Sequence, residues 1–196
     1  MARSGILETK RLRLVPFSSE FLTERYVGWL NDKEVVRYSE QRFRTHTIDS
    51  CREYMRGFEG ESPSFFWAVL SKDPSEGHIG NISGYVDPPN TLADVAILIG
   101  EKEVWNKGYG SESFSAVVDY LFRKEGMRKV TAGTVSANEA MIGVMKRAGM
   151  HQDGRRLRHY VFQGKEVDIV HYALFRDDWL RSKNQPCAGN EGQCQR

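Results

Sequence analysis

The feature of this sequence that most constrains its fold is a strand, a glycine-bearing turn and a helix that follow one another in mid-chain. Residues 94–100 (Asp-Val-Ala-Ile-Leu-Ile-Gly) form an apolar, β-branched run of strand length. Apolar residues then recur at helical spacing, which predicts a helix over residues 109–124. Between the two elements, Gly108 and Gly110 lack a Cβ atom, and the first N–H groups of a helix have no partners. This arrangement favours the binding of a phosphate or diphosphate.

A Gly-x-Gly turn is also compatible with a simple tight connection between strand and helix. The turn lacks the Gly-x-Gly-x-x-Gly pattern of dinucleotide-binding folds and the Gly-Lys-Ser/Thr ending of nucleotide-triphosphate loops. Lys107 adds a cation next to the glycines. The choice between the two interpretations therefore depends on the rest of the chain.

Length and composition exclude several classes of protein. A chain of 196 residues is long enough for one domain with a sizeable core, and its net charge of +2 gives no electrostatic case for nucleic-acid binding. No apolar run approaches membrane-spanning length and no signal-peptide pattern is present, so we expect no membrane association and a cytoplasmic location. The three cysteines (Cys51, Cys187 and Cys194) make neither a disulfide framework nor a zinc site, and we expect no metal.

The remaining patterns predict a mixed sheet with helices on it. Strands joined by short turns favour antiparallel pairing, and later strand-helix-strand units favour parallel pairing. We therefore predict an α+β (mixed α/β) fold, with a single domain over residues 1–181, a six- to seven-stranded sheet and about four helices. Residues 182–196 are predicted to be disordered. The expected strands are 11–15, 65–70, 78–86, 92–100, 129–136, 159–163 and 166–175; the expected helices are one capped by Ser18 or Ser19 and closed by Asn31-Asp32, then 48–58, 109–124 and 138–148.

Four motifs, in this order, resemble those of the GNAT superfamily of acetyl-CoA-dependent N-acetyltransferases. Residues 105–110 (Trp-Asn-Lys-Gly-Tyr-Gly) are similar to its acyl-CoA signature Arg/Gln-x-x-Gly-x-Gly/Ala, with tryptophan in the first place. The resemblance covers residues 7–180 and is closest to the branch that acetylates ribosomal-protein N-termini and small amines. The other motifs are Trp29-Leu30-Asn31-Asp32 with Val35, Lys146-Arg147-Ala148-Gly149 after the helix led by Asn138, and the strand 168–174.

The resemblance implies acetyl-CoA as a co-substrate and a splayed strand pair that receives it. The pantetheine arm would pair with one of these strands like an added strand. Asn138 would offer an amide to this arm or serve as a plain N-cap, and Met145 would pack against the arm or the core. The residues implied to contact the co-substrate are Ile97, Leu98, Ile99, Trp105, Asn106, Lys107, Gly108, Tyr109, Gly110, Ser111, Asn138 and Met145.

The implied reaction is the attack of a neutral amine on a thioester, which requires a base and a source of a proton for the thiolate. Asp94 is the leading candidate for the base and Glu40 is the second; the alternative for each is a solvent-facing carboxylate. Many relatives have a tyrosine acid where this chain has Met145, which cannot donate a proton. Water, Tyr109 or Tyr172 is left as the proton source. Lone strand histidines such as His78 and His171 are more often structural.

The acceptor is expected at the segment 38–44, which corresponds to the variable substrate-shaping loop of the family. Tyr38 and Arg42 are the predicted acceptor-binding residues, and Arg37, Arg42 and Arg44 would suit a phosphate-bearing acceptor or form a solvated basic loop. We expect transfer to the primary amine of a small molecule, for example a nucleotide-linked amino sugar. The alternatives are a protein N-terminal acetyltransferase and a non-catalytic acyl-CoA-binding module. The family also suggests a homodimer.

Overall fold

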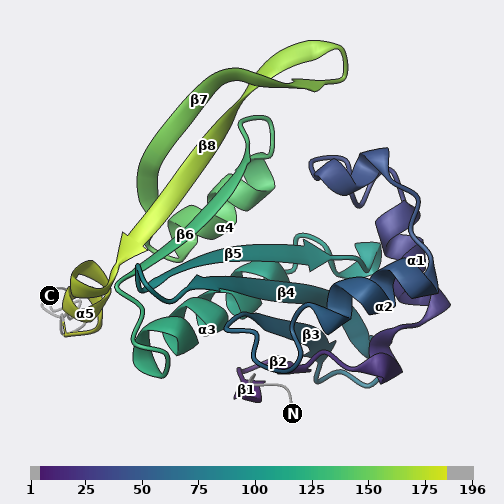
Figure 1. The fold of residues 1–196 in the computed structure, drawn as a ribbon, viewed down its shortest axis with the longest axis horizontal. Coiled ribbons are helices and arrows are strands. Elements are labelled where there is room, and N and C mark those ends of the chain that lie inside the picture. The colour runs from purple at the N-terminus through teal and green to yellow at the C-terminus, as the bar shows by residue number, and fades with distance from the viewer. Residues whose placement is uncertain (1–4, 185–196) are drawn as a thin grey trace, which may run out of the picture.

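The computed structural model describes residues 5–184, which form one eight-stranded sheet with helices on both faces (Figure 1). The strand order is β1-β2-β3-β4-β5-β6-β8-β7. The strands are β1 (Leu7–Glu8), β2 (Leu12–Pro16), β3 (Phe65–Ser71), β4 (His78–Asp87), β5 (Leu92–Ile99), β6 (Lys129–Val135), β7 (His151–Phe162) and β8 (Lys165–Phe175). The helices are α1 (Glu24–Asn31), α2 (Ile48–Arg56), α3 (Tyr109–Arg123), α4 (Glu139–Arg147) and α5 (Arg176–Asn184), with short 3-10 turns η1 (Ser19–Phe21), η2 (Glu40–Phe43) and η3 (Lys102–Val104).

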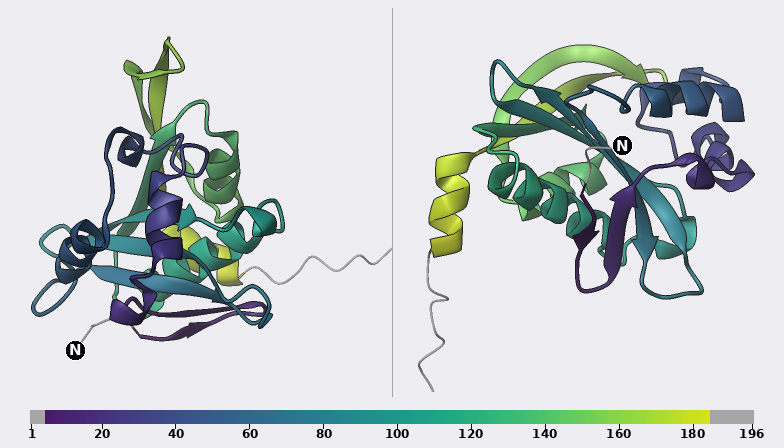
Figure 2. Two further views of the ribbon diagram at one scale, coloured as in Figure 1. Left: turned by 90° about the vertical axis from the view of Figure 1, so that its right-hand side faces the viewer. Right: turned by 60° about the horizontal axis from the view of Figure 1, so that its bottom comes forward.

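The mixed α/β fold is confirmed, and the change of strand direction occurs where the patterns predict it. The strands from β2 to β5 pair antiparallel in chain order. The chain then passes through α3 and returns as β6, which pairs parallel with β5. β8 inserts between β6 and β7 and is antiparallel to both. Figures 1 and 2 show β7 and β8 as a long hairpin that extends away from the first strands of the sheet.

The sequence misses two elements and shortens a third. β1 has only two residues and pairs with β2, so it is too short for a pattern to reveal. β7 begins at His151, whereas the sequence predicted a strand only from residue 159. The first half of β7 was missed because it is an exposed, polar edge strand whose residues do not alternate between apolar and polar. α5 is a fifth helix, polar apart from the buried Trp179, and it includes residues 182–184, which were predicted to be disordered. The rest of that predicted tail, residues 185–196, lies outside the described residues.

The predicted cap of the first long helix is wrong. Ser18 precedes η1 and its side chain makes no cap hydrogen bond. α1 begins after Thr23, whose hydroxyl accepts a hydrogen bond from the Tyr26 N–H at 3.2 Å. Ser18 and Ser19 therefore lie at the start of a 3-10 turn, before the helix that they were expected to cap.

The two faces of β5 point into different cores. Side chains alternate along a strand, and Val95, Ile97 and Ile99 pack with α3 in the larger core. Leu98 points the other way, into the smaller core formed with α1 and α2. Asp94 is in register with Thr131 on β6 and has the same parity as Leu98, so it belongs to the α1–α2 face.

β5 and β6 separate after a short parallel contact. Their pairing consists of Leu92 with Lys129, Ala93 with Val130, and Asp94 with Thr131. Beyond that point β5 pairs only with β4, and β6 pairs only with β8, so the sheet opens into a fork (Figure 1). The expected splayed strand pair is confirmed. Residues 95–99 consequently present one side of their backbone to the fork.

The motif Trp29-Leu30-Asn31-Asp32 shapes the segment that faces the fork. Trp29 packs on Gly100, where an added Cβ would lie 2.0 Å from the indole ring. The Asn31 side chain donates to the His46 carbonyl and accepts from the His46 N–H, both at 2.9 Å. Asp32 accepts from the N–H of Glu34 at 2.8 Å. The motif thus fixes both ends of the segment 33–46.

His78 is a structural histidine of the smaller core. Its ring packs between Phe21 and Trp29, with both ring centroids 5.0 Å away, and its Nε2 lies 2.9 Å from the Gly80 carbonyl oxygen, to which it donates. Burial lowers the pKa of His78 from 6.5 to about 4, since the hydrogen bond to Gly80 opposes burial only in part.

We predict that His78 makes the protein less stable in mild acid. Unfolded histidine binds a proton below about pH 6.5 and the folded form resists it, so stability should fall by about 3 kcal/mol between about pH 6.5 and about pH 4. Urea unfolding across this range tests it: His78→Gln should show a smaller loss than wild type. The exposed His151→Gln serves as the control. Equal losses in wild type and His78→Gln would contradict the prediction.

Candidate functional site

A cleft of about 990 Å³ occupies the fork between β5 and β6. Its walls come from the end of β5, the turn before α3, the start of α4 and the segment 34–40. Residues of β6, β7 and β8 complete it. Of the residues selected from the sequence, the following line this cleft: Tyr38, Glu40, Asp94, Ile97, Leu98, Ile99, Trp105, Asn106, Gly108, Tyr109, Gly110, Ser111 and Asn138.

The turn before α3 presents free donors to the cleft. Asn106 and Gly108 have positive φ values of 61° and 83°, which turn the chain sharply into the helix. The first α-helical hydrogen bond runs from the Glu112 N–H to the Gly108 carbonyl at 3.0 Å. The preceding N–H groups of the first turn have no carbonyl one turn earlier to bond. Together with the helix dipole they form a site for an anion.

Arg147 adds a positive charge beside these donors. Its Nε donates to the Ser111 hydroxyl at 2.8 Å, which brings the end of α4 to the start of α3. Arg147 also lines the cleft. Sequence analysis quoted it only as part of a motif, because helix register alone does not bring the end of one helix to the start of another.

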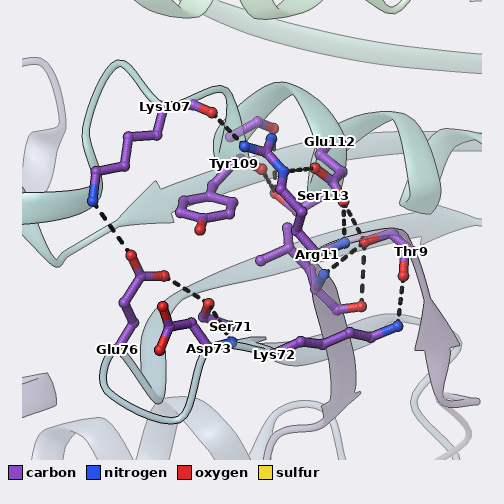
Figure 3. A network of polar contacts seen from close by, with 12 residues as sticks. Thr9, Arg11, Ser71, Lys72, Asp73, Glu76, Lys107, Tyr109, Glu112 and Ser113 are labelled. Carbon is purple, nitrogen blue, oxygen red and sulfur yellow. Dashed lines mark hydrogen bonds and ion pairs between the residues drawn. The ribbon is translucent and has the colours of Figure 1, made fainter.

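A partly buried carboxylate holds the turn from behind (Figure 3). Glu112 accepts hydrogen bonds from the Thr9 hydroxyl at 2.6 Å, from the Arg11 backbone at 2.8 Å and from Arg11 Nε at 2.6 Å. Arg11 Nη1 donates to the Lys107 carbonyl at 2.7 Å, and its guanidinium lies 4.4 Å from the Tyr109 ring centroid. Burial alone would raise the pKa of Glu112. The hydrogen bonds from Thr9 and Arg11 outweigh this effect and hold the pKa below its usual value.

Lys107 and Met145 do not line the cleft. The Lys107 ammonium lies 3.4 Å from a carboxylate oxygen of Glu76, away from the donors of the turn (Figure 3). Met145 is fully buried in the larger core. The side chain of Asn138 does line the cleft, but it accepts from the Met141 N–H at 3.2 Å and donates to the Thr134 hydroxyl at 3.0 Å. These bonds favour the N-cap interpretation that the sequence left open.

Asp94 lies at the point where the fork opens. It belongs to the last register pair of β5 and β6, and its carboxylate accepts a hydrogen bond from the Thr131 hydroxyl at 2.7 Å. The Asp94 side chain is solvent-exposed within the cleft, but desolvation by the protein around it still raises its pKa, while the bond from Thr131 and the charge of His171 partly oppose this. A carboxylate with a raised pKa in a cleft suits proton abstraction.

The far wall of the cleft contains the segment selected for the acceptor. The Tyr38 ring lies 5.1 Å from the Phe162 ring at the tip of the β7–β8 hairpin, so the two walls meet there. Arg42 is not among the lining residues: it donates to the Ser39 carbonyl at 2.8 Å and pairs with Glu40 at 3.1 Å. The charges of Arg42 and Glu40 therefore offset each other.

Within residues 5–184, no helix is long and apolar enough to cross a membrane. The same residues contain no group of three or more His, Cys, Asp or Glu side chains that could hold a metal ion.

Comparison with known proteins identifies relatives along most of the chain. The model of the acetyltransferase (GNAT) domain family matches residues 11–151. The uncharacterized N-acetyltransferase YnaD of Bacillus subtilis is 31% identical over 175 residues, which cover 88% of this chain and 98% of that protein. Among solved structures, the ribosomal L7/L12 α-N-protein acetyltransferase RimL with coenzyme A has a TM-score of 0.75 at 16% identity, covering 88% of this chain and 99% of that chain. The spermidine N-acetyltransferase of Vibrio cholerae with coenzyme A and spermine has a TM-score of 0.76 at 15% identity, covering 88% and 99%.

We predict that the contacts of Glu112 stabilise the fold and fix the turn. Glu112→Gln keeps the size of the side chain but weakens its hydrogen bonds to Thr9 and Arg11. The free energy of unfolding should fall by about 1.5–3 kcal/mol. Urea denaturation measures it, with the exposed loop variant Glu61→Gln as a control expected to stay within about 0.5 kcal/mol of wild type. An unchanged urea midpoint for Glu112→Gln would contradict the prediction.

Proposed function

Because this chain belongs to the GNAT family of acetyltransferases, we propose that it transfers the acetyl group of acetyl-CoA to the primary amine of a small molecule. N-acetyltransferase activity of the GNAT type follows from the family. The small-molecule acceptor and the roles of individual residues are our proposal. The observation that carries it is the position of Asp94, a carboxylate with a raised pKa at the base of the fork, on the α1–α2 face.

The residues present suit acetyl-CoA. The N–H groups at the start of α3 and the guanidinium of Arg147 would bind its diphosphate. The free backbone edge of residues 95–99 would pair with the amides of the pantetheine arm. Trp105 fixes the turn to the end of β5, since its indole N–H donates to the Ile99 carbonyl at 2.9 Å. Acetyl-CoA supplies the activated acyl group, and the chain positions it in the fork.

Asp94 would remove the proton of the acceptor ammonium. At pH 7, deprotonating an amine of pKa near 8 costs about 1.4 kcal/mol, and a lysine-like amine costs roughly 4.6 kcal/mol. A carboxylate next to the amine stabilises the bound ammonium and then accepts its proton. Glu40 is the weaker candidate, because it is already paired with Arg42.

A small amine fits the acceptor end better than a bulky one. The contact of Tyr38 with Phe162 joins the two walls, and it restricts the opening between the segment 34–40 and the hairpin tip. A nucleotide-linked amino sugar would rely on Arg37, which lines the cleft and stacks on Tyr38 at 4.7 Å, since Arg42 is occupied by Glu40. A protein N-terminus is the second candidate, supported by the likeness in fold to RimL.

Thiol release from acetyl-CoA with a panel of acceptors tests the proposal. The panel contains spermidine, a nucleoside-diphosphate amino sugar and a peptide with a free N-terminus. Turnover with a small amine and none with the peptide is the expected result. Turnover with the peptide alone would favour the second candidate, and binding of acetyl-CoA without turnover on any amine would contradict the proposal.

We predict that a larger side chain at Gly110 blocks acetyl-CoA. A Cβ here would lie 3.7 Å from Ile99 and 3.9 Å from Val144, which are ordinary contacts, so alanine should be tolerated. The branched methyl groups of valine would extend into the cleft. Calorimetry should show that Gly110→Val weakens acetyl-CoA binding at least about 100-fold, or about 2.7 kcal/mol. The control Gly110→Ala should bind within about tenfold of wild type. Wild-type affinity of Gly110→Val would refute the assignment of the turn.

We also predict that Asp94 sets the acidic limb of the pH–rate profile. The carboxylate is the active form, so kcat should fall as pH drops through the raised pKa of Asp94. Asp94→Asn should lower kcat about 10²–10⁴-fold, abolish this limb and leave acetyl-CoA affinity unchanged. Asp87→Asn, at the end of β4 and not among the residues that line the cleft, is the matched control. Retention of the wild-type limb in Asp94→Asn would exclude Asp94 as the base.

A further inference from the structure

His171 on β8 lines the cleft and has a buried nitrogen without a hydrogen-bond partner. Three buried side-chain atoms of the described residues lack a hydrogen bond: His46 Nε2, Asn81 Oδ1 and His171 Nε2. Of these three residues, only His171 lines the cleft. Buried polar atoms in proteins are almost always paired, and an exception within a cleft indicates a partner that arrives with a ligand or with water.

The neighbouring strands leave room for the His171 ring. Its register partners are Gly133 on β6 and Gly154 on β7. A Cβ at Gly133 would lie 3.1 Å from His171 Nδ1 and 3.4 Å from Cε1, so the ring lies over Gly133 on the side of the fork. A Cβ at Gly154 would be 4.0 Å from the His171 Cβ, an ordinary contact. Neither adjacent strand places a charged side chain directly beside the imidazole.

His171 and Asp94 share one face of the sheet. Asp94 is in register with Thr131, and Gly133, two residues further along β6, is in register with His171. Because side chains alternate along a strand, both residues emerge on the same side. The charge of His171 also acts on Asp94, so the two groups are electrostatically coupled across β6. The cleft therefore holds a carboxylate and an imidazole on its acceptor side.

We propose that His171 carries a proton from the attacking nitrogen to the leaving sulfur during acetyl transfer, a role that rests on the function proposed above. The nitrogen lone pair forms the C–N bond, and the C–S bond breaks with its electron pair on sulfur. Asp94 first takes one proton from the ammonium and later returns it to water. The nitrogen loses its second proton to the imidazole, which then protonates the thiolate, so His171 ends the cycle neutral.

Imidazole is suited to this transfer. Its neutral form has one donor and one acceptor nitrogen and exchanges protons near neutral pH. Two tyrosines that line the cleft have their rings in other contacts: the Tyr38 ring packs against Phe162, and the Tyr109 ring lies against the Arg11 guanidinium. Met145 is buried in the core and carries no proton.

Kinetics of His171→Gln test the transfer. Glutamine forms hydrogen bonds but does not carry a proton, so kcat should fall about 10²–10⁴-fold, while KM for acetyl-CoA changes less than about threefold. Imidazole added to His171→Ala should restore part of kcat, which a purely structural role would not allow. The control His151→Gln, on the exposed start of β7, should match wild type. A kcat of His171→Gln within threefold of wild type, or no rescue by imidazole, would overturn the proposal.

A second measurement does not depend on turnover. The carboxyl ¹³C resonance of Asp94, identified by its loss in Asp94→Asn, reports the pKa of Asp94. Since the charge of His171 lowers this pKa, it should be higher in His171→Gln than in wild type and unchanged in His151→Gln. An unchanged titration of Asp94 in His171→Gln would refute the coupling. If the coupling is present but no amine is acetylated, the proposed function fails and the pairing of the two residues stands.

A pair of glycine variants tests the placement of the ring. Gly133→Ala should displace the imidazole, because the new methyl group would press on Nδ1, whereas Gly154→Ala leaves the ring in place. We expect the Asp94 titration to move in Gly133→Ala and to remain as in wild type in Gly154→Ala. Thermal unfolding of each variant confirms that it is folded. Identical Asp94 titrations in the two variants would contradict the proposed position of His171.

Discussion

The site depends on the fact that the hydrogen-bonded pairing between β5 and β6 stops after three residue pairs. Only residues 92–94 of β5 are in register with β6. Past them, Gly100 and Glu101 both donate to the Ile79 carbonyl, an irregularity that bends the end of β5. β6 meanwhile remains paired with β8. Backbone groups that face the fork require partners, and a ligand with amides in an extended chain supplies them. The cleft thus follows from an interruption of the sheet.

The second constraint is the support of the turn by a residue far away in the chain. Arg11 is separated from Glu112 by 101 positions, yet the two make several hydrogen bonds, and Arg11 also bonds to the Lys107 carbonyl. Asn106 and Gly108 hold uncommon left-handed conformations, which surrounding contacts must maintain. The connection between β1 and β2 therefore supports the turn without lining the cleft. The turn and its support form one unit that spans half of the chain.

Sequence patterns predicted the parts of this unit that are local. The strand β5, the turn after it and the helix α3 could be predicted because the glycine spacing and the apolar periodicity that indicate them lie within one continuous segment. Asp94 was selected as a residue of that strand, and it does line the cleft. The pairing of Arg42 with Glu40, the burial of Met145 and the room around His171 depend on which distant residues are neighbours. Periodicity carries no such information, and an exposed polar edge such as the first half of β7 gives no periodic signal at all.

The two faces of β5 contribute different parts of the site. Ile97 and Ile99 pack in the core with α3, whereas Asp94 lies on the opposite face, the one that α1 and α2 cover. The wall that would bind the co-substrate is built on rigid elements. The acceptor wall comes from residues 34–40 and from a hairpin tip that reaches them through Tyr38 and Phe162. Changes in those two segments can alter the acceptor without disturbing the turn, because they share no contact with Arg11 or Glu112. Acceptor identity is accordingly the property that the common fold constrains least.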